Sequence, residues 1–397
     1  MSNLKYIVIL IILIAFFSCD NLEITSVQKD SFIKLFGYSK VDIGNDIKEI
    51  SSGYLIAATV MQEGENQTDI ALIKTDKYGN QKEIEIIEGG GNDEAASLLL
   101  TNDGGYIILG TYEDTTNKQR DIYLAKYNSD FTQEWEHFIG NSSDDYGVAI
   151  TKTGSGFIIV GNTEEANAVN GNPEGTYDIL LVKVDTEGNT KWINSFGGVG
   201  EDVSGDVLAI DAGYIIIGTT NSFNELNQGG SNIILIQTNS VGNETDKFTY
   251  GGSFNDEGTS IVESGDGGYV IAGTIKSLSG GPSDIYIAKL ENDIHTIIDN
   301  NSFGLSATNE TGHDLLKTET GYALVGSQIS GSVESAYFLN IDNNLVELDD
   351  KFYGGYDAQV VYSFVQTTDK GFAMVGSSGF EGNDQILLLK VNSDGEL

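Results

Sequence analysis

Pairs of neighbouring acidic residues recur along this 397-residue chain, and they are the side chains with the most obvious chemistry. The full pairs are Asp93-Glu94, Asp144-Asp145, Glu201-Asp202 and Asp256-Glu257, and Asn309-Glu310 is a partial copy. Carboxylate oxygens bind hard cations, so a ring of such pairs predicts a site for calcium or for a cationic ligand. The alternative is structural: one acid of each pair caps a loop by accepting backbone N–H groups, and its neighbour stays solvated.

The structural interpretation of these pairs is favoured, because a repeat copies the residues that maintain its fold before any others. No segment has the Asp-x-Asp-x-Asp-Gly spacing of a compact calcium loop. Calcium is therefore the one cofactor that we keep as a hypothesis, with the eight acids of the four full pairs as its ligands.

Few other residues are candidates for catalysis. His137, His295 and His313 are the only histidines; none recurs, and a lone histidine in a strand is more often packed or solvated than catalytic. Two carboxylates at a defined separation can hydrolyse a glycosidic bond, but 59 acidic residues produce many chance pairs. Trp135 and Trp192 are expected to pack rather than to stack on sugars, because other units place apolar residues at their positions. We assign no catalytic residue from the sequence.

The composition excludes several classes of function. The chain carries 59 Asp and Glu against 21 Lys and Arg, a formal charge of -38, which would repel a nucleic-acid backbone. A single cysteine excludes an internal disulfide, and the chain has too few Cys and His for a four-ligand zinc centre of those residues. Apolar residues make up 40%, so the charge does not indicate disorder.

The first twenty residues look like a targeting signal. Lys5 precedes an apolar stretch over 6–17, which is too short to cross a bilayer comfortably but suits a secretory signal. The stretch resembles a bacterial lipoprotein signal, in which Cys19 is lipidated after cleavage behind Ser18. Phe16 and Phe17 depart from the strict motif, and an ordinary cleaved signal or an uncleaved anchor remains the alternative. We therefore expect a signal peptide over 1–18, a tether over 19–30 and attachment to the bacterial envelope at the outer membrane, facing the periplasm or the surface.

Beyond residue 30 the chain repeats one unit seven times. Each unit has a small residue and an aromatic before an apolar run, and these aromatics lie 50 to 57 residues apart. The column reads Gly53-Tyr54, Gly105-Tyr106, Gly156-Phe157, Gly213-Tyr214, Gly268-Tyr269, Gly321-Tyr322 and Gly371-Phe372. A second column, usually Asp and an apolar strand, follows 12 to 21 residues later, and a third ends in an aromatic and glycine, as in Phe196-Gly197. Each unit thus contains four strands and no helical period.

The strands predict a β-propeller. Runs such as 214–217 and 233–236 are apolar at consecutive positions, so both faces of each sheet must be covered. Four-stranded antiparallel sheets packed around an axis achieve this, whereas a parallel β-helix would have shorter repeats without hairpins. The strand before the aromatic column carries mostly small residues two apart on one face, such as Gly44 and Asp46, so it is expected to be innermost.

The two ends of the chain are expected to close the ring. With strands labelled A to D from the axis outward, the last unit stops at Leu397 without a D strand, and 31–37 is a D-like strand with no A, B or C before it. We therefore predict an all-β chain, a single seven-bladed β-propeller over 31–397, in which the N-terminal strand completes the last blade.

The repeats resemble those of bacterial secreted and lipoprotein β-propellers over the whole of 31–397. The matching segments are Asp103-Gly104-Gly105-Tyr106, Asp284-Ile285-Tyr286, and Gly188-Asn189 through Trp192 to Phe196-Gly197-Gly198. This resemblance implies the fold more strongly than any function, since such propellers serve adhesion, scaffolding, carbohydrate binding and several kinds of catalysis.

The expected function follows from the connections between strands. The A–B and C–D connections are tight turns, whereas the B–C and D–A connections are longer and unequal, notably over 164–176 and 221–231. We expect a monomeric, non-catalytic binding or scaffold module that uses the rim of B–C and D–A loops. Its expected partners are the membrane through the lipid and a protein or glycan at the rim, with no nucleic acid. The alternative is an envelope enzyme acting on glycans through rim carboxylates.

Overall fold

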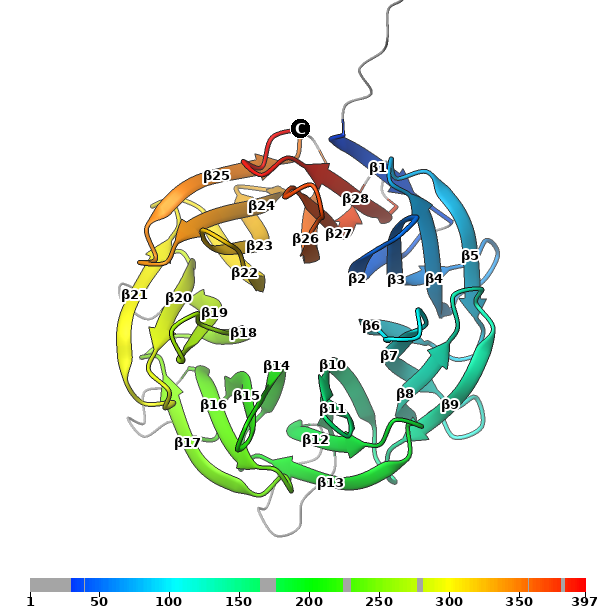
Figure 1. The fold of residues 1–397 in the computed structure, drawn as a ribbon, viewed down its shortest axis with the longest axis horizontal. Helices are drawn as coiled ribbons and strands as arrows, with labels where there is room; N and C mark the ends of the chain where they lie inside the picture. The colour runs from blue at the N-terminus through cyan, green and yellow to red at the C-terminus, as the bar shows by residue number, and fades with distance from the viewer. Residues whose placement is uncertain are drawn as a thin grey trace, which may run out of the picture.

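Seven four-stranded antiparallel sheets surround a central axis in the computed structural model of this chain, which is a seven-bladed β-propeller (Figure 1). The structure describes residues 30–38, 40–164, 176–223, 230–276, 281–355, 357–379 and 383–397. In these ranges there is no helix, and thus none that could span a membrane. The predicted signal and Cys19 lie outside the described residues.

Each blade consists of four consecutive strands from the axis outward, except the last. The strands are β2 (Asp42–Ile50), β3 (Gly53–Met61), β4 (Thr68–Asp76), β5 (Gln81–Ile87) in blade 1; β6 (Glu94–Leu100), β7 (Tyr106–Glu113), β8 (Arg120–Tyr127), β9 (Gln133–Ile139) in blade 2; β10 (Asp145–Thr153), β11 (Gly156–Thr163), β12 (Asp178–Val184), β13 (Thr190–Phe196) in blade 3; and β14 (Asp202–Ile210), β15 (Gly213–Thr220), β16 (Asn232–Asn239), β17 (Glu244–Tyr250) in blade 4. They continue with β18 (Glu257–Glu263), β19 (Tyr269–Ile275), β20 (Asp284–Leu290), β21 (Ile297–Phe303) in blade 5; β22 (Asn309–Lys317), β23 (Gly321–Ser330), β24 (Val333–Asp342), β25 (Glu347–Tyr353) in blade 6; and β26 (Gln359–Gln366), β27 (Phe372–Ser378), β28 (Gln385–Val391) in blade 7.

The N-terminal strand closes the ring, as predicted. Strand β1 (Phe32–Phe36) pairs antiparallel with β28, from Phe32 opposite Lys390 to Phe36 opposite Ile386, and becomes the outer strand of blade 7. Phe32 and Phe36 pack against the apolar cluster between blades 7 and 1. The two ends of the chain therefore share one sheet, and the closure combines hydrogen bonds with apolar burial.

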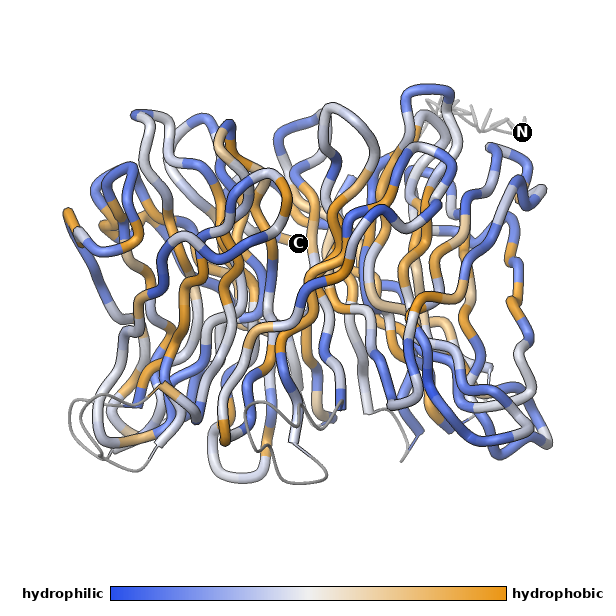
Figure 2. The backbone as a smooth tube through the Cα atoms, turned by 90° about the horizontal axis from the view of Figure 1, so that it is seen from below, coloured by the Kyte–Doolittle hydropathy of each residue, from blue (hydrophilic) through white to orange (hydrophobic). Residues whose placement is uncertain are grey.

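Burial follows the order of strands within a blade. The second and third strands are almost wholly buried, as in β15 and β12, while the outer strand β13 alternates between partly buried and exposed residues. The expectation that both faces of each sheet are covered therefore holds for the inner strands but is wrong for the outer strands, because no further layer packs outside them. Those strands also carry acids, such as Asp349 and Asp350 of β25. Figure 2 shows the apolar strands between two largely hydrophilic rims.

A β-bulge in every inner strand changes the predicted placement of the small residues. In β2 the register shifts between Gly44 and Asp46, which pair with neighbouring residues of β3 and leave Asn45 as the extra residue. Gly44 and Asp46 therefore lie on opposite faces, not on one face as predicted, because the bulge shifts the alternation by one residue. Gly44 faces the neighbouring blade, since a Cβ on it would lie 2.2 Å from Val375 Cγ2. Asp46 instead lines the axial channel.

The two ends of the ring differ in their connections. We call the end with the A–B and C–D turns the turn rim, and the end with the B–C and D–A connections the loop rim. At the C–D turns an Asp or Asn accepts the backbone N–H groups two and four residues later, as Asn239 does from Val241 and Asn243, each at 3.0 Å. The same arrangement recurs at Asp76, Asn128, Asp185, Asp342 and Asn392. The predicted turn chemistry is confirmed there.

Candidate functional site

One buried acid per blade caps a loop at the loop rim in six of the seven blades. Asp202 accepts the N–H of Gly198 at 2.8 Å and the hydroxyls of Thr220 and Ser222. Asp256 accepts the N–H groups of Gly252 and Lys276 at 2.9 and 2.7 Å. The equivalent buried acids are Asp42, Asp93, Asp145 and Glu310. These contacts are the ones that the capping interpretation requires.

The capping acids explain the third sequence column, in which an aromatic precedes glycine. A Cβ on Gly304 would lie 2.1 Å from Asp284 Oδ1 and 2.6 Å from Glu310 Oε2, so any larger residue would displace a carboxylate. In blade 1 the corresponding pair of acids is Asp69 and Asp93. Burial, partly offset by backbone hydrogen bonds, raises the pKa of Asp93 to about 6. The glycines of the third column are therefore required, because their strands pass close to the buried acids of the loop rim.

The acid of each sequence pair that does not cap a loop has a different environment. Glu201 and Glu257 are exposed, Asp144 accepts the N–H of Arg120 at 3.0 Å, and Glu94 lies 4.0 Å from the Arg120 guanidinium. The buried acid is the first member in Asp93-Glu94 but the second in Glu201-Asp202, so the pairs are out of register with one another. Within the described ranges, no group of three or more His, Cys, Asp or Glu could hold a metal ion. The calcium site stays a prediction.

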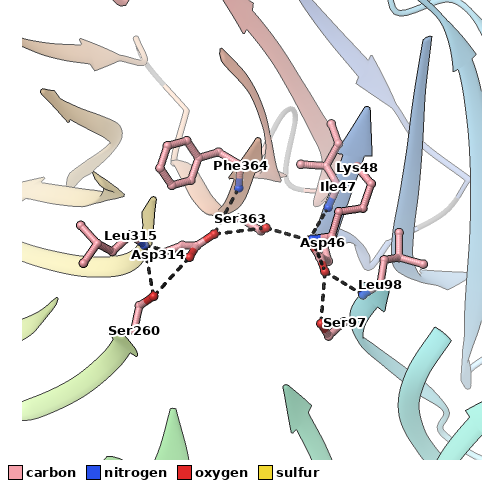
Figure 3. Close-up of polar contacts among 10 residues, drawn as sticks. All are labelled: Asp46, Ile47, Lys48, Ser97, Leu98, Ser260, Asp314, Leu315, Ser363 and Phe364. Carbon is pink, nitrogen blue, oxygen red and sulfur yellow. Dashed lines mark hydrogen bonds and ion pairs between the residues drawn. The ribbon is translucent and has the colours of Figure 1, made fainter. Parts of the chain in front are cut away.

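A second set of residues, polar in six of the seven blades, surrounds the axis, one after each bulge. Ser363 Oγ lies 2.9 Å from Asp46 Oδ1 and 3.4 Å from Asp314 Oδ2, and thus bridges blades 1 and 6 (Figure 3). Ser260 Oγ lies 3.4 Å from carboxylate oxygens of both Asp206 and Asp314. We call this set the axial ring; its members, from blade 1 to blade 7, are Asp46, Ser97, Ala149, Asp206, Ser260, Asp314 and Ser363.

The axial ring is a hydrogen-bonded chain that is interrupted at one blade. It runs from Asp206 through the serines and Asp314 to Asp46, which also accepts the hydroxyl of Ser97 at 3.2 Å. Ala149 of blade 3 has no polar side chain, so the chain does not close between Ser97 and Asp206. Each carboxylate also accepts a backbone N–H from a neighbouring blade, for example that of Leu98 at 2.7 Å from Asp46. The ring therefore ties the inner strands together.

The acids of the axial ring are not equivalent electrostatically. Asp46 forms an ion pair with Lys48 at 2.7 Å. Burial raises the pKa of Asp206 to about 6, and burial together with the charge of Asp206 raises the pKa of Asp314 to about 7. Carboxyls that exchange protons near neutral pH are the kind of group that general acid catalysis uses. They border an axial cavity of about 380 Å³.

The channel opens at the loop rim beside two aromatic rings. His313 and Tyr362 are the extra residues of the bulges in blades 6 and 7, and their rings stack with centroids 5.3 Å apart and planes 16° apart. His313 Nδ1 lies 2.8 Å from the carbonyl of Val361, so that nitrogen carries the proton, and burial lowers the pKa of the ring. The rings line one side of a hollow of about 640 Å³ at the mouth of the channel.

We call this whole hollow the mouth. Blades 4 and 5 form the rest of its lining. Its polar lining consists mainly of Glu201, Asn221, Asn255 and Glu257, together with Thr219 and Thr259. Asn255 is positioned by the N–H of Ser231, which it accepts at 3.3 Å. Carboxylates, amides and an aromatic pair thus converge on one concavity, an arrangement typical of a binding site.

The other candidates from the sequence lie apart from the mouth. His137 and His295 are near the turn rim, where they contact the carbonyl of Glu187 at 2.9 Å and the carboxylate of Asp246 at 2.7 Å. Trp135 and Trp192 pack partly buried against clusters between blades. Most of the longest B–C loops, 165–175 and 224–229, lies outside the described residues.

Sequence reasoning missed the axial ring and Tyr362 as functional candidates. The axial-ring positions form one column of the repeat, but the bulge that turns them toward the axis leaves no mark in the hydrophobic pattern. The available signal was variation within that column, where Asp46, Asp206 and Asp314 stand among smaller residues.

Comparisons with known proteins place the chain at the level of its fold. No family model matches it. A stretch of 173 residues is 20% identical to the regulatory protein FlaEY of Caulobacter vibrioides, which covers 38% of this chain but only 18% of FlaEY. A puromycin hydrolase mutant superposes with a TM-score of 0.54 at 8% identity, over 83% of this chain and 49% of its own.

Two further solved structures agree with the fold. An acylaminoacyl peptidase of Pyrococcus horikoshii has a TM-score of 0.53 at 11% identity, over 91% of this chain and 52% of its own. An α-L-arabinanase of Penicillium chrysogenum has a TM-score of 0.50 at 9% identity, over 92% of this chain and 99% of its own. The chain thus spans about half the length of the hydrolase and the peptidase. At these identities the comparisons show a β-propeller and no activity.

Proposed function

We propose that this chain is a non-catalytic binding module that recognises its partner at the loop rim, with the mouth of the axial channel as the centre of the site. The observation that carries this proposal is the convergence of unlike groups at the mouth, where the repeat is broken. His313 and Tyr362 have no aromatic counterpart at the bulge position of the other blades. Residues that depart from the repeat are not needed by the repeated fold.

Exposed apolar residues extend the proposed surface around the mouth. Val199, Phe254 and Leu305 lie in three successive D–A loops and are 63%, 41% and 57% exposed. Ile329 and Val333 flank the neighbouring B–C hairpin of blade 6 and are also exposed. Apolar groups rimmed by polar loops favour a macromolecular partner, either a protein or a glycan.

Attachment to the envelope through Cys19 is part of the proposal, and the first described strand begins at the rim opposite the mouth. Strand β1 begins at the turn rim, where Ser31 Oγ donates to the carbonyl of Glu396 at 3.3 Å. A lipid on Cys19 would therefore be joined to the ring at its turn rim, the end opposite the loop rim. Labelling with an alkyne fatty acid in a bacterial host should mark the wild type and not Cys19→Ser. Equal labelling of the two would exclude this anchor.

A second candidate function is an envelope enzyme acting on glycans. The observation in its favour is the pair Asp206 and Asp314, whose raised pKa values suit proton transfer beneath the mouth. The rim acids are poorer candidates, because most of those that are buried accept backbone donors. The α-L-arabinanase has a similar fold, but at 9% identity its activity does not transfer to this chain.

One pair of screens separates the two functions. We expect the purified chain to bind members of a glycan or peptide array and to show no turnover in a panel of glycosidase substrates. Tyr362→Leu should lose the array signal while keeping its melting curve, because the side chain is 37% exposed. An empty array together with turnover that Asp206→Asn and Asp314→Asn abolish would establish the enzyme instead.

A further inference from the structure

The mouth has a consistent negative charge. Glu201 and Glu257 stand on blades 4 and 5, next to the buried caps Asp202 and Asp256, and both are exposed. Neither forms an ion pair with any described residue, and no Lys or Arg lines the hollow. Lys48 lies deeper in the channel and is held by Asp46. A concave site of one sign on a chain of charge -38 concentrates cations and repels anions.

The aromatic pair also attracts cations, as the two glutamates do. Tyr362 presents an exposed ring, and its stacking on His313 holds that ring in place. The histidine adds no positive charge at neutral pH, because burial lowers its pKa. A cation close to the face of a tyrosine ring is attracted to the ring electrostatically, and this attraction strengthens as both are desolvated.

The donor and acceptor pattern distinguishes among cations. Hard metal ions prefer several carboxylates at short range, and the described residues bring no such group together. A guanidinium instead offers five N–H donors in a plane, which two separate carboxylates and the amide oxygens of Asn221 and Asn255 can accept. The same plane stacks on a tyrosine ring.

We propose that the mouth binds an arginine side chain presented by a partner protein. This inference rests on the proposed function, since it names the chemistry of the partner at the loop rim. The guanidinium is received by Glu201 and Glu257 and covered by Tyr362, while the surrounding Val199, Phe254 and Leu305 contact the rest of the partner's surface.

The test uses a fluorescent Gly-Arg-Gly-Arg-Gly peptide and the same peptide with citrulline, which is neutral and nearly isosteric, in place of arginine. Anisotropy at low salt should show the arginine peptide binding at least about 10-fold more tightly than the citrulline peptide. Glu201→Gln/Glu257→Gln should remove most of that difference. Glu263→Gln/Glu347→Gln makes the same change in net charge away from the mouth and should alter affinity by less than about 2-fold.

Three outcomes would overturn this inference: equal affinity for the two peptides, an equal loss in the control variant, or no effect of the Glu201→Gln/Glu257→Gln change. Melting curves of all variants identify any that fail to fold, and Tyr362→Leu gives an independent second variant. The proposed function fails separately. If an array ligand without arginine is lost in Tyr362→Leu, recognition at the loop rim stands while the arginine inference is wrong.

Discussion

The two rims of this propeller meet the same requirement with different results. Both ends of the blades carry backbone N–H groups that strands cannot pair, and at both ends an Asp, Asn or Glu accepts them. At the turn rim this arrangement recurs almost unchanged around the ring. At the loop rim the buried caps also recur, but the residues next to the axis change from Gly205 and Thr259 to His313 and Tyr362. Repetition marks what holds the fold, and its loss marks where a ligand is to be sought.

A second hollow at the turn rim sharpens this comparison. It has a volume of about 700 Å³ and lies across blades 3 to 5, lined by the turns at Gly154, Asp211 and Gly267. Its aromatic residues, Tyr214 and Tyr269, belong to the repeated column and are almost fully buried. This hollow is slightly larger than the mouth, but its two aromatic residues belong to the repeated fold. We therefore expect it to be a gap between blades.

The largest effect is expected from opening the ring, which would disturb both rims together. Deletion of residues 30–38 removes β1 and exposes the edge of β28 and the apolar surface beneath Phe32 and Phe36. The melting temperature should fall by about 10 °C or more, measured by differential scanning calorimetry. An unchanged melting curve would contradict the observed closure.

The next largest effect is expected from removing a loop-rim cap of blade 4, which we compare with removing a turn-rim cap of the same blade. Asp202→Ala leaves the N–H of Gly198 and two hydroxyls without their buried acceptor, and should cost about 3 kcal/mol of unfolding free energy. Asn239→Ala removes a partly exposed cap at the turn rim and should cost about 1 kcal/mol, because water can replace it. Urea denaturation measures both. Equal losses would mean that the rims do not differ in burial as described.

A smaller effect is expected from the axial ring as the pH changes. The pKa of Asp314 is about 7 in the folded protein, against 3.8 for an unperturbed aspartate. The folded state therefore holds the proton more tightly than the unfolded chain does. The stability that this carboxyl contributes is therefore complete below about pH 4 and is lost as the pH rises through 7. Asp314→Asn should melt about 2 to 5 °C above the wild type at pH 8, with little difference at pH 4. Asp211→Asn, on an exposed turn, is the control, and parallel pH curves for all three proteins would contradict the account.

The smallest effect is expected from removing calcium. If the paired acids serve as caps, EDTA should leave the melting temperature within about 1 °C, since their buried members already accept backbone and hydroxyl donors. Added calcium should likewise have no effect. A rise with calcium that EDTA reverses would establish the metal site that the sequence pairs predict.

The sequence predicted the architecture well because the repeat carries it redundantly. The aromatic column with its seven members, the four-strand units and the missing outer strand of the last unit all indicated one ring, and the pairing of Phe32 to Phe36 with β28 confirms it. The turn caps were predictable for the same reason, since Asp185 and Asn239 act within five residues of themselves.

The site was less predictable, because it depends on contacts between blades. Ser363 and Asp46 are 317 residues apart in the chain but share a hydrogen bond across the closure. The paired acids show the same limit in another way. The sequence favoured one capping acid in each pair, and the structure has one, but neighbouring residues point to opposite sides and only one of the two is buried. Only the structure shows which member of each pair is which.

The most direct test of the account blocks one rim at a time. In a Cys19→Ser background the chain has no other cysteine, so Glu257→Cys at the mouth and Asp211→Cys in the turn-rim hollow can each be labelled with a polyethylene glycol maleimide. Binding to the array ligands is then measured for both labelled proteins. We expect the label at position 257 to abolish binding and the label at position 211 to leave it unchanged. The reverse result would place recognition at the turn rim and contradict the central claim.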